Sequence, residues 1–173
     1  MKKLLSITAV LLALSSTSAY AGGLELLIGQ RLDLRDYNTN FFAAGLAFGG
    51  KYLKLGINYS HASPAVGSYN GFRPYLMVDL PFGFSIGNNS ELVIAPTIDF
   101  GPEIGFIAGE KVIDIMMLGF GLKTQFYFND SIGVGLTPFH MSTSFGTYTT
   151  GGPGFTRQTR MTYDLFFSLL YRW

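Results

Sequence analysis

Two residues in the first half of the chain have a spacing that suits hydrolytic chemistry. His61 and Ser63 lie two positions apart, so in an extended strand their side chains share one face, and the imidazole could serve the hydroxyl as a general base. Parity counted from Leu53 through Tyr59 places both on the leucine-rich face. No Asp or Glu on a neighbouring strand is well placed to orient His61, and ordinary interfacial polar residues explain the pair better. We therefore treat them as weak catalytic candidates.

A larger set of charged residues alternates with apolar ones along the chain. If the strands close into a barrel, these charges would fill its interior, where they need partners because unpaired burial of a charge is costly. We expect a plug of ion pairs, with a narrow water or ion path as the alternative. The expected lumen ion network consists of Glu25, Arg31, Asp33, Lys54, Arg73, Asp79, Glu91, Asp99, Lys123, Asp164 and Arg172, with Arg160 near the outer end.

The elements that position these residues are strands, and the last one carries the clearest pattern. Over residues 163–173 every second residue is apolar or aromatic, while Asp164, Ser168 and Arg172 lie on the opposite face with Phe166 and Leu170. The outward set is Tyr163, Leu165, Phe167, Leu169, Tyr171 and Trp173. This strand resembles the C-terminal signature of bacterial outer-membrane β-barrels. The resemblance implies that the barrel-assembly machinery reads this set as an assembly signal.

The N-terminus predicts export. Met1-Lys2-Lys3 is a positive segment, residues 4–14 are mostly apolar, and Ala19-Tyr20-Ala21 is a cleavage site of the A-x-A type. We expect residues 1–21 to be a cleaved Sec signal peptide and residues 22–173 to form one β-barrel domain. Without Lys2 and Lys3 the mature chain has ten basic and eleven acidic residues, which predicts no nucleic-acid-binding surface.

The composition favours a membrane barrel. Only 13% of residues are charged, 16% are aromatic, 22 are glycine and none is cysteine, whereas ordinary globular domains are roughly 25% charged. Residues 22–173 contain no apolar run long enough for a spanning helix. A closed barrel is the other structure that satisfies backbone hydrogen bonds in lipid.

Alternation interrupted by Gly, Pro and Asn clusters predicts eight strands. Their approximate ranges are 24–34, 41–48, 53–60, 72–80, 91–101, 112–128, 132–146 and 163–173. Pro74 and Pro96 are interpreted as bulges or strand ends, because proline removes a ladder donor. If the N-terminus lies in the periplasm, the connections 49–50, 81–90 and 129–131 are periplasmic. The connections 35–40, 61–71, 102–111 and 147–158 are then extracellular, in keeping with short periplasmic turns and longer outer loops.

Each strand has a leucine-rich face and an opposite face, and the composition of the opposite face decides which of the two points out of the barrel. Besides the charges, that face carries many small residues, including Gly29, Gly45, Gly56, Ala43 and Ala47. Such a face is a poor water-exposed surface but a reasonable lining for a narrow barrel. We therefore place the leucine-rich face against lipid. The predicted fold class is all-β, an eight-stranded antiparallel up-and-down transmembrane β-barrel.

This pattern resembles the small eight-stranded outer-membrane barrels typified by the OmpA transmembrane domain and OmpX. The resemblance is one of architecture, and its sharp residues are Ala19-Tyr20-Ala21 and Tyr171-Arg172-Trp173. It implies the outer membrane of a Gram-negative bacterium, with membrane lipid and lipopolysaccharide as partners. We expect a monomer, and the loops 61–71 and 147–158 as the segments that would contact an extracellular ligand.

A hydrolase is the third interpretation. His61-Ala62-Ser63 is similar to the His-x-Ser of lipid A deacylases of the PagL type, but here Pro64 follows and the motif lies in the first half of the chain. The other histidine, His140, falls on the opposite wall of an eight-stranded ring, so no metal site is expected, nor any cofactor. We expect a non-catalytic barrel with a structural or surface-interaction role and a closed lumen, with a narrow channel as the second choice.

Overall fold

The computed structural model describes residues 22–34, 40–62, 68–107, 110–149 and 160–173. These segments contain no helix with the length and apolar character of a membrane span. The described strands are β1 (Gly23–Asp33), β2 (Asn40–Gly49), β3 (Leu53–Ala62), β4 (Tyr69–Asp79), β5 (Phe82–Ile86), β6 (Ser90–Ile107), β7 (Glu110–Tyr127), β8 (Ile132–Ser144), β9 (Thr147–Thr149) and β10 (Met161–Arg172).

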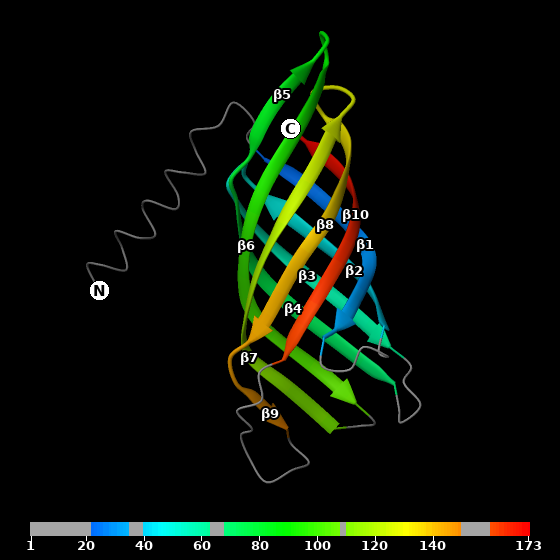
Figure 1. Ribbon diagram of the computed structural model, residues 1–173, viewed down its shortest axis with the longest axis vertical. Helices are drawn as coiled ribbons and strands as arrows, with labels where there is room; N and C mark the ends of the chain where they lie inside the picture. Colours follow the sequence, from blue (N-terminus) through cyan, green and yellow to red (C-terminus); the bar gives the residue numbers. More distant parts are fainter. Residues whose placement is uncertain (1–21, 35–39, 63–67, 108–109, 150–159) are drawn as a thin grey trace, which may run out of the picture.

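Eight of the described strands form a closed antiparallel ring in the order β1, β2, β3, β4, β6, β7, β8 and β10 (Figure 1). β1 pairs with both β2 and β10, so the first and last strands of the ring close the barrel. The prediction of an eight-stranded up-and-down barrel is confirmed. We call the end with the turns 49–52, 87–89 and 129–131 the base, and the opposite end the rim.

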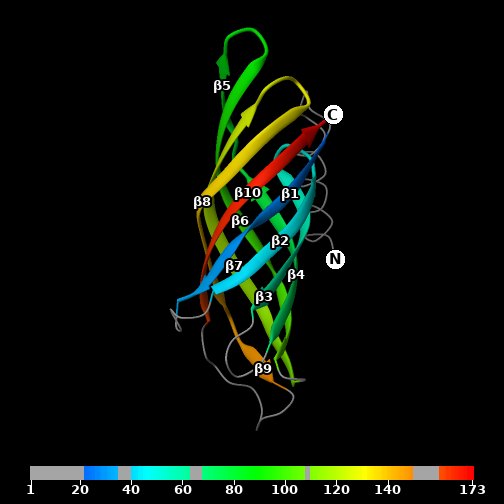
Figure 2. The same ribbon diagram turned by 90° about the vertical axis from the view of Figure 1, so that its right-hand side faces the viewer.

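The predicted connection 81–90 is wrong. Phe82–Ile86 pairs with Ser90–Ile94 as a hairpin, and β5 stands beyond the rest of the barrel at the base (Figures 1 and 2). The alternation of Phe82, Phe84 and Ile86 carries the strand pattern past Pro81. Gly87 adopts a φ of 64° at the turn, a conformation that glycine reaches without steric cost. This hairpin replaces the expected periplasmic loop.

The predicted connection 102–111 is also wrong, because β6 continues to Ile107 and β7 begins at Glu110. Pro102 does not end β6, and Pro74 and Pro96 are neither bulges nor strand ends, because Pro74 pairs with Ile57 and Pro96 with Leu122 in continuous register. Between the pairs Phe72–Ile104 and Leu76–Phe100 the β4–β6 ladder has a gap, and Pro74 and Pro102 lie at its centre. Because neither proline has a backbone N–H, both missing hydrogen-bond donors fall within this one gap of the ladder. At the rim, both loops expected to contact a ligand are shorter than predicted. Thr147–Thr149 pairs with β7 instead of beginning a loop, and the two ends of the expected loop 61–71 belong to β3 and β4.

The two faces of the barrel wall differ sharply. Large apolar side chains point outward, with 62% of Leu169 and 58% of Phe167 exposed, whereas 1% of Arg31 and 0% of Asp164 are exposed. This alternation is the expected consequence of a two-residue side-chain period. The interior of the barrel is thus largely polar and charged, inside an apolar shell.

Two β-bulges change the alternation along β7 and β8. Gly101 and Glu103 of β6 face Met117 and Asp114 of β7, so β7 contains one extra residue there, and Ile115 and Met116 both point outward. β8 also has an extra residue near Pro138, where the register with both neighbouring strands shifts. A bulge re-aims the side chains beyond it. As a result, Asp114 and His140 point into the lumen.

Candidate functional site: the charged lumen

The base-side cluster joins four charged residues from four strands. Lys54 of β3 forms ion pairs with Glu25 of β1 and Asp79 of β4, the latter at 2.9 Å between Nζ and Oδ2. Lys123 of β7 contacts the same carboxylates at 2.9 and 3.2 Å. Gln125 Nε2 donates to Glu25 Oε1 at 3.0 Å. Each ammonium therefore bridges both carboxylates across the barrel, which offsets the cost of burying all four charges.

A separate ion pair lies at the base itself. Arg172 Nη1 is 2.6 Å from Glu91 Oε2, and Arg172 Nε donates to the carbonyl oxygen of Asp130 at 2.7 Å. The guanidinium lies over the ring of Tyr127, 3.8 Å from its centroid. The ring of Tyr127 is buried and therefore belongs to the lumen.

The rim-side cluster is centred on Arg31. Its guanidinium contacts Asp164 of the neighbouring strand β10 and Glu103 of β6, both at 2.6 Å. Arg73 of β4 pairs with Asp99 of β6 and donates to Ser142 at 3.2 Å. These bonds cross the barrel in several directions and leave the cluster almost without solvent exposure.

His140 links the two halves of this cluster. Its Nε2 lies 2.5 Å from Asp99 Oδ2, and its Nδ1 lies 2.9 Å from Asp164 Oδ2. Both ring nitrogens face carboxylate oxygens, and an ionised carboxylate can accept hydrogen bonds but cannot donate one. The doubly protonated imidazolium is therefore the form that satisfies this geometry.

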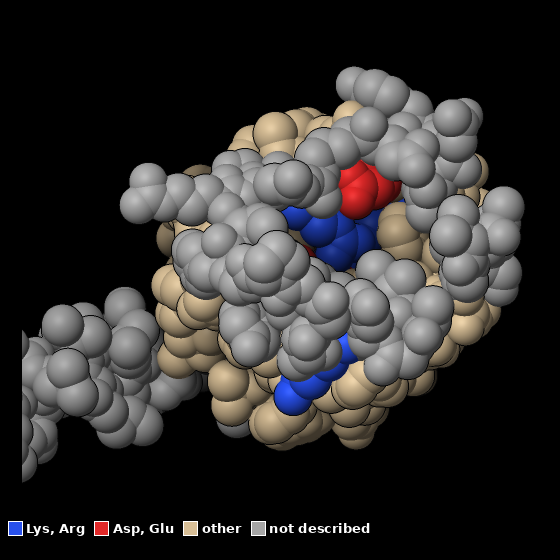
Figure 3. Space-filling view, turned by 90° about the horizontal axis from the view of Figure 1, so that it is seen from below, with Lys and Arg blue, Asp and Glu red and all other residues tan. Residues whose placement is uncertain are grey.

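Arg160 closes the cluster on the rim side. Its guanidinium is 3.1 Å from Asp33, 3.1 Å from Glu103 and 3.3 Å from Asp114. Tyr69 donates its hydroxyl to Glu103 at 2.5 Å and lies under Arg160, 5.3 Å from ring centroid to guanidinium. Viewed onto the rim, acidic and basic atoms are both visible in the opening (Figure 3).

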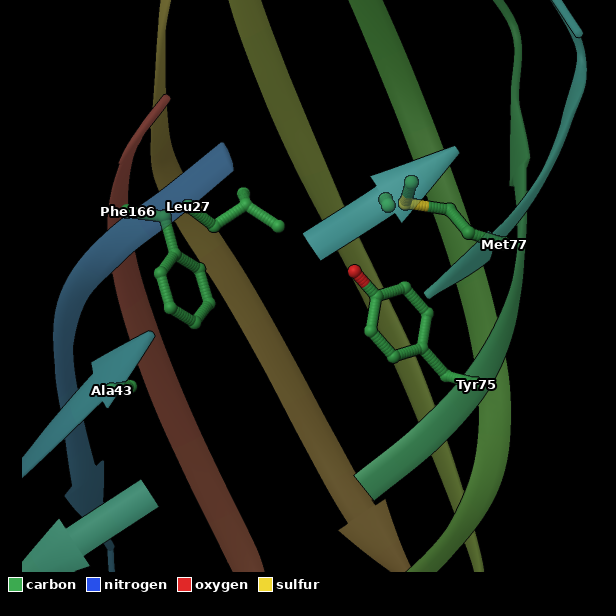
Figure 4. Close-up of a cluster of buried hydrophobic side chains, with 6 residues drawn as sticks. Leu27, Ala43, Tyr75, Met77 and Phe166 are labelled. Carbon is green, nitrogen blue, oxygen red and sulfur yellow. The ribbon is translucent and has the colours of Figure 1, made fainter. Parts of the chain in front are cut away.

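An apolar septum separates the two clusters. Along β4 the two inward residues between Arg73 and Asp79 are Tyr75 and Met77, and these side chains point into the lumen together with Leu27 of β1 and Phe166 of β10 (Figure 4). The septum consists of Leu27, Ala43, Ala47, Tyr75, Met77 and Phe166, all buried. An apolar constriction opposes the passage of ions because it does not hydrate them.

Two small cavities lie within the lumen. One of about 80 Å³ opens at the base and is lined by Glu25, Lys54 and Asp79 among others. The other, about 30 Å³, borders the septum and is lined by Asn58, Thr97 and His140 among others. The side-chain oxygens of Asn58 and Thr97 are buried and have no hydrogen-bond partner among the described residues. A cavity of that size has room for water, which would satisfy both oxygens.

Each of the eleven residues expected in the lumen network takes part in at least one ion pair. Sequence reasoning omitted Glu103, Asp114 and His140 from that set. Glu103 could have been found, because Asp99, Gly101 and Glu103 are spaced two residues apart and share one face of the strand. It was omitted because residues 102–111 were predicted to be a loop. Asp114 and His140 could not, because bulges reverse their parity.

The weak catalytic candidates are only partly described. His61 is half-buried at the rim end of β3, and its Nδ1 lies 3.0 Å from Asn70 Oδ1, which also accepts the Tyr59 hydroxyl at 2.7 Å. Ser63 lies outside the described residues, as do residues 1–21 and most of the loops expected to contact a ligand. In the described part of the chain, no group of three or more His, Cys, Asp or Glu could hold a metal ion.

The expected assembly signal forms the outer face of β10. Phe167, Leu169, Tyr171 and Trp173 are exposed, and Tyr163 and Leu165 are half-buried on the same face. The rings of Tyr171 and Trp173 lie 5.8 Å apart at the base. Recognition of this face by assembly machinery stays a prediction.

No protein-family model matches the sequence, and no curated protein is significantly similar to it. Three solved barrels are similar in structure. Neisserial surface protein A (NspA) is 8% identical with a TM-score of 0.47, covering 88% of this chain and 96% of that chain. The N-terminal β-barrel domain of Pseudomonas aeruginosa OprF is 9% identical, with a TM-score of 0.43 and coverage of 87% and 97%. Ail, the attachment invasion locus protein of Yersinia pestis, is 12% identical with a TM-score of 0.38, covering 88% of this chain and 96% of that chain. The strand pairing itself establishes the fold.

Proposed function

We propose that this chain is an integral outer-membrane barrel of a Gram-negative bacterium, with a structural or surface-interaction role and a closed lumen. The observation that carries the proposal is the inversion of the usual globular arrangement. Apolar side chains cover the outside, while ion pairs and small residues fill the inside. A soluble protein that exposed such a continuous apolar surface would aggregate, whereas hydrocarbon is a favourable solvent for it.

The closed lumen is supported by three successive layers, namely the base-side cluster, the septum and the rim-side cluster. Most polar groups of the two clusters are paired, and side chains fill most of the septum, an arrangement that opposes the passage of a hydrated ion. Specificity toward an extracellular ligand would then belong to the segments that connect the strands at the rim within 61–71 and 147–158.

The solvent requirement of the mature chain tests the membrane assignment. Residues 22–173 should remain monodisperse only in detergent or lipid and should aggregate when detergent is removed. A monodisperse, folded chain in detergent-free buffer would contradict the proposal. Planar-bilayer recordings of the wild type should show no steady conductance.

A narrow passage for water or small ions is the second candidate. The cavity of about 30 Å³ beside the septum and the cavity at the base lie in series along the lumen, so rearranged ion pairs could connect them. Swelling of liposomes that contain the protein tests this candidate. Swelling above that of protein-free liposomes would favour it over the closed barrel.

A lipid A hydrolase is the third candidate, favoured by the contact between His61 and Asn70, which holds the imidazole by its Nδ1. Mass spectrometry of lipid A from cells that express the wild type or the variant His61→Ala with Ser63→Ala tests it. Identical acylation in the two strains removes the hydrolase from consideration.

A further inference from the structure

The hairpin of β5 and β6 is amphipathic where it extends past the base of the barrel. Phe84 of β5 pairs with Leu92 of β6, which pairs with Phe126 of β7, so the three side chains lie on the outer face. The outer face of this extension consists of Phe82, Phe84, Ile86, Leu92, Ile94, Phe126 and Phe128. We call this set the base patch. None of its members is charged.

The opposite face of the hairpin carries Gly83, Ser85, Glu91 and Val93, of which Gly83, Glu91 and Val93 line the cavity at the base. A Cβ on Gly83 would lie 2.2 Å from Oε1 of Glu91, and Glu91 is the partner of Arg172. The carboxylate therefore occupies the space beside Gly83 on the inner side. This leaves the apolar outer face of β5 exposed, with 58% of Phe82 and 52% of Phe84 accessible.

The base patch continues the apolar shell of the barrel. Outward side chains on β6 run from Leu92 to Phe106, about 46 Å along the strand at roughly 3.3 Å per residue. On β1 the outward series from Leu24 to Leu32 covers about 26 Å by the same measure. With a strand tilt of about 40°, the β6 side is taller than the band of about 25 Å that a membrane barrel presents. The apolar surface of β6 that exceeds the height of this band must also be kept away from water.

We propose that the base patch inserts into the periplasmic leaflet of the membrane, so that the β5–β6 hairpin is a membrane anchor rather than a free periplasmic turn. This inference rests on the proposed membrane location of the barrel. Continuity with the apolar shell, aromatic composition and lack of charge all fit a lipid interface, where aromatic rings are favoured. Tilting of the barrel or local thickening of the bilayer accommodates the taller side.

Depth-dependent fluorescence quenching tests the anchor. The single tryptophan is removed by Trp173→Phe, and one new tryptophan is introduced as Phe84→Trp in the base patch, Ile28→Trp on the outer face of β1, or Asn88→Trp at the hairpin turn. Each variant is reconstituted in vesicles of phosphatidylcholine with bromine atoms either near the headgroup or near the chain centre. Folding is checked by circular dichroism before the measurement.

We expect the tryptophan at position 84 to be quenched by the shallow bromines and shielded from aqueous iodide. The tryptophan at position 88 should respond to iodide, and that at position 28 to the deeper bromines. Quenching at position 28 with water-like behaviour at position 84 would overturn the anchor and leave the membrane barrel intact. Absence of bromine quenching at position 28 would contradict the proposed function itself, and the anchor with it.

Discussion

The Nδ1 of His140 lies 2.9 Å from Oδ2 of Asp164 inside the barrel, although the alternation of β8 taken from its base end would direct His140 outward. His140 also contacts Asp99 through Nε2. The ring therefore ties β6, β8 and β10 together within the rim-side cluster.

Replacement of His140 should destabilise the barrel because it leaves two buried carboxylates with one donor fewer each. We expect His140→Leu to lower the free energy of unfolding by about 2 kcal/mol, since a lost hydrogen bond to a buried charge costs that much. Urea titration in lipid vesicles, followed by tryptophan fluorescence, measures the change. His61→Leu, on the outer face, is the control and should have little effect. Equal losses in the two variants would contradict the role assigned to His140.

Loss of charge in the rim-side cluster should weaken the barrel without opening it. The variant Arg31→Ala with Arg73→Ala leaves the septum and the base-side cluster in place, so planar-bilayer conductance should stay at the baseline while the unfolding midpoint falls. A further variant that adds Tyr75→Ala and Phe166→Ala removes much of the septum and serves as the comparison. Steady conductance in the first variant would favour the narrow passage over the closed lumen.

The base-side cluster should show strong energetic coupling. Lys54→Met leaves Glu25 and Asp79 with less compensation, and breaking a buried ion pair in this way costs about 3 kcal/mol or more. The variant Glu25→Gln with Lys54→Met removes one charge of each sign, so its loss should be smaller than the sum of the two single losses. A double-mutant cycle in unfolding free energy measures the difference. Additive losses would mean that the two residues act independently.

A close backbone contact at the seam between β1 and β10 should require glycine. A Cβ on Gly29 would lie 1.9 Å from the carbonyl oxygen of Leu165, whereas a Cβ on Gly83 would meet only the side chain of Glu91. Because a backbone cannot move aside as a side-chain end can, Gly29→Ala should cost about 1–3 kcal/mol. Gly83→Ala is the matched control in the same unfolding assay and should cost less. The reverse order would show that the β1–β10 seam tolerates a methyl group.

Alternation was enough to predict the architecture and the residues of the lumen network wherever strands stay in phase. Glu25, Lys54 and Asp79 share a face with small residues, and the period of two places them inside whatever the exact strand ends are. The hairpin at 82–94 was not predicted because Pro81 and Gly87-Asn88-Asn89 both favour a turn, and the sequence does not say that a short strand fits between them.

The amino-acid sequence by itself determined that one face of each strand is apolar and that the other carries the charged residues, because the side-chain period of a strand is a local property of the backbone. Only the tertiary structure decided which ions meet and where the phase changes. The extra residues in β7 and β8 are accommodated by the registers of neighbouring strands, which are non-local, and they turn Asp114 and His140 inward. Pairing across the barrel likewise depends on its closure, which brings Arg31 to Glu103 over 72 positions of sequence.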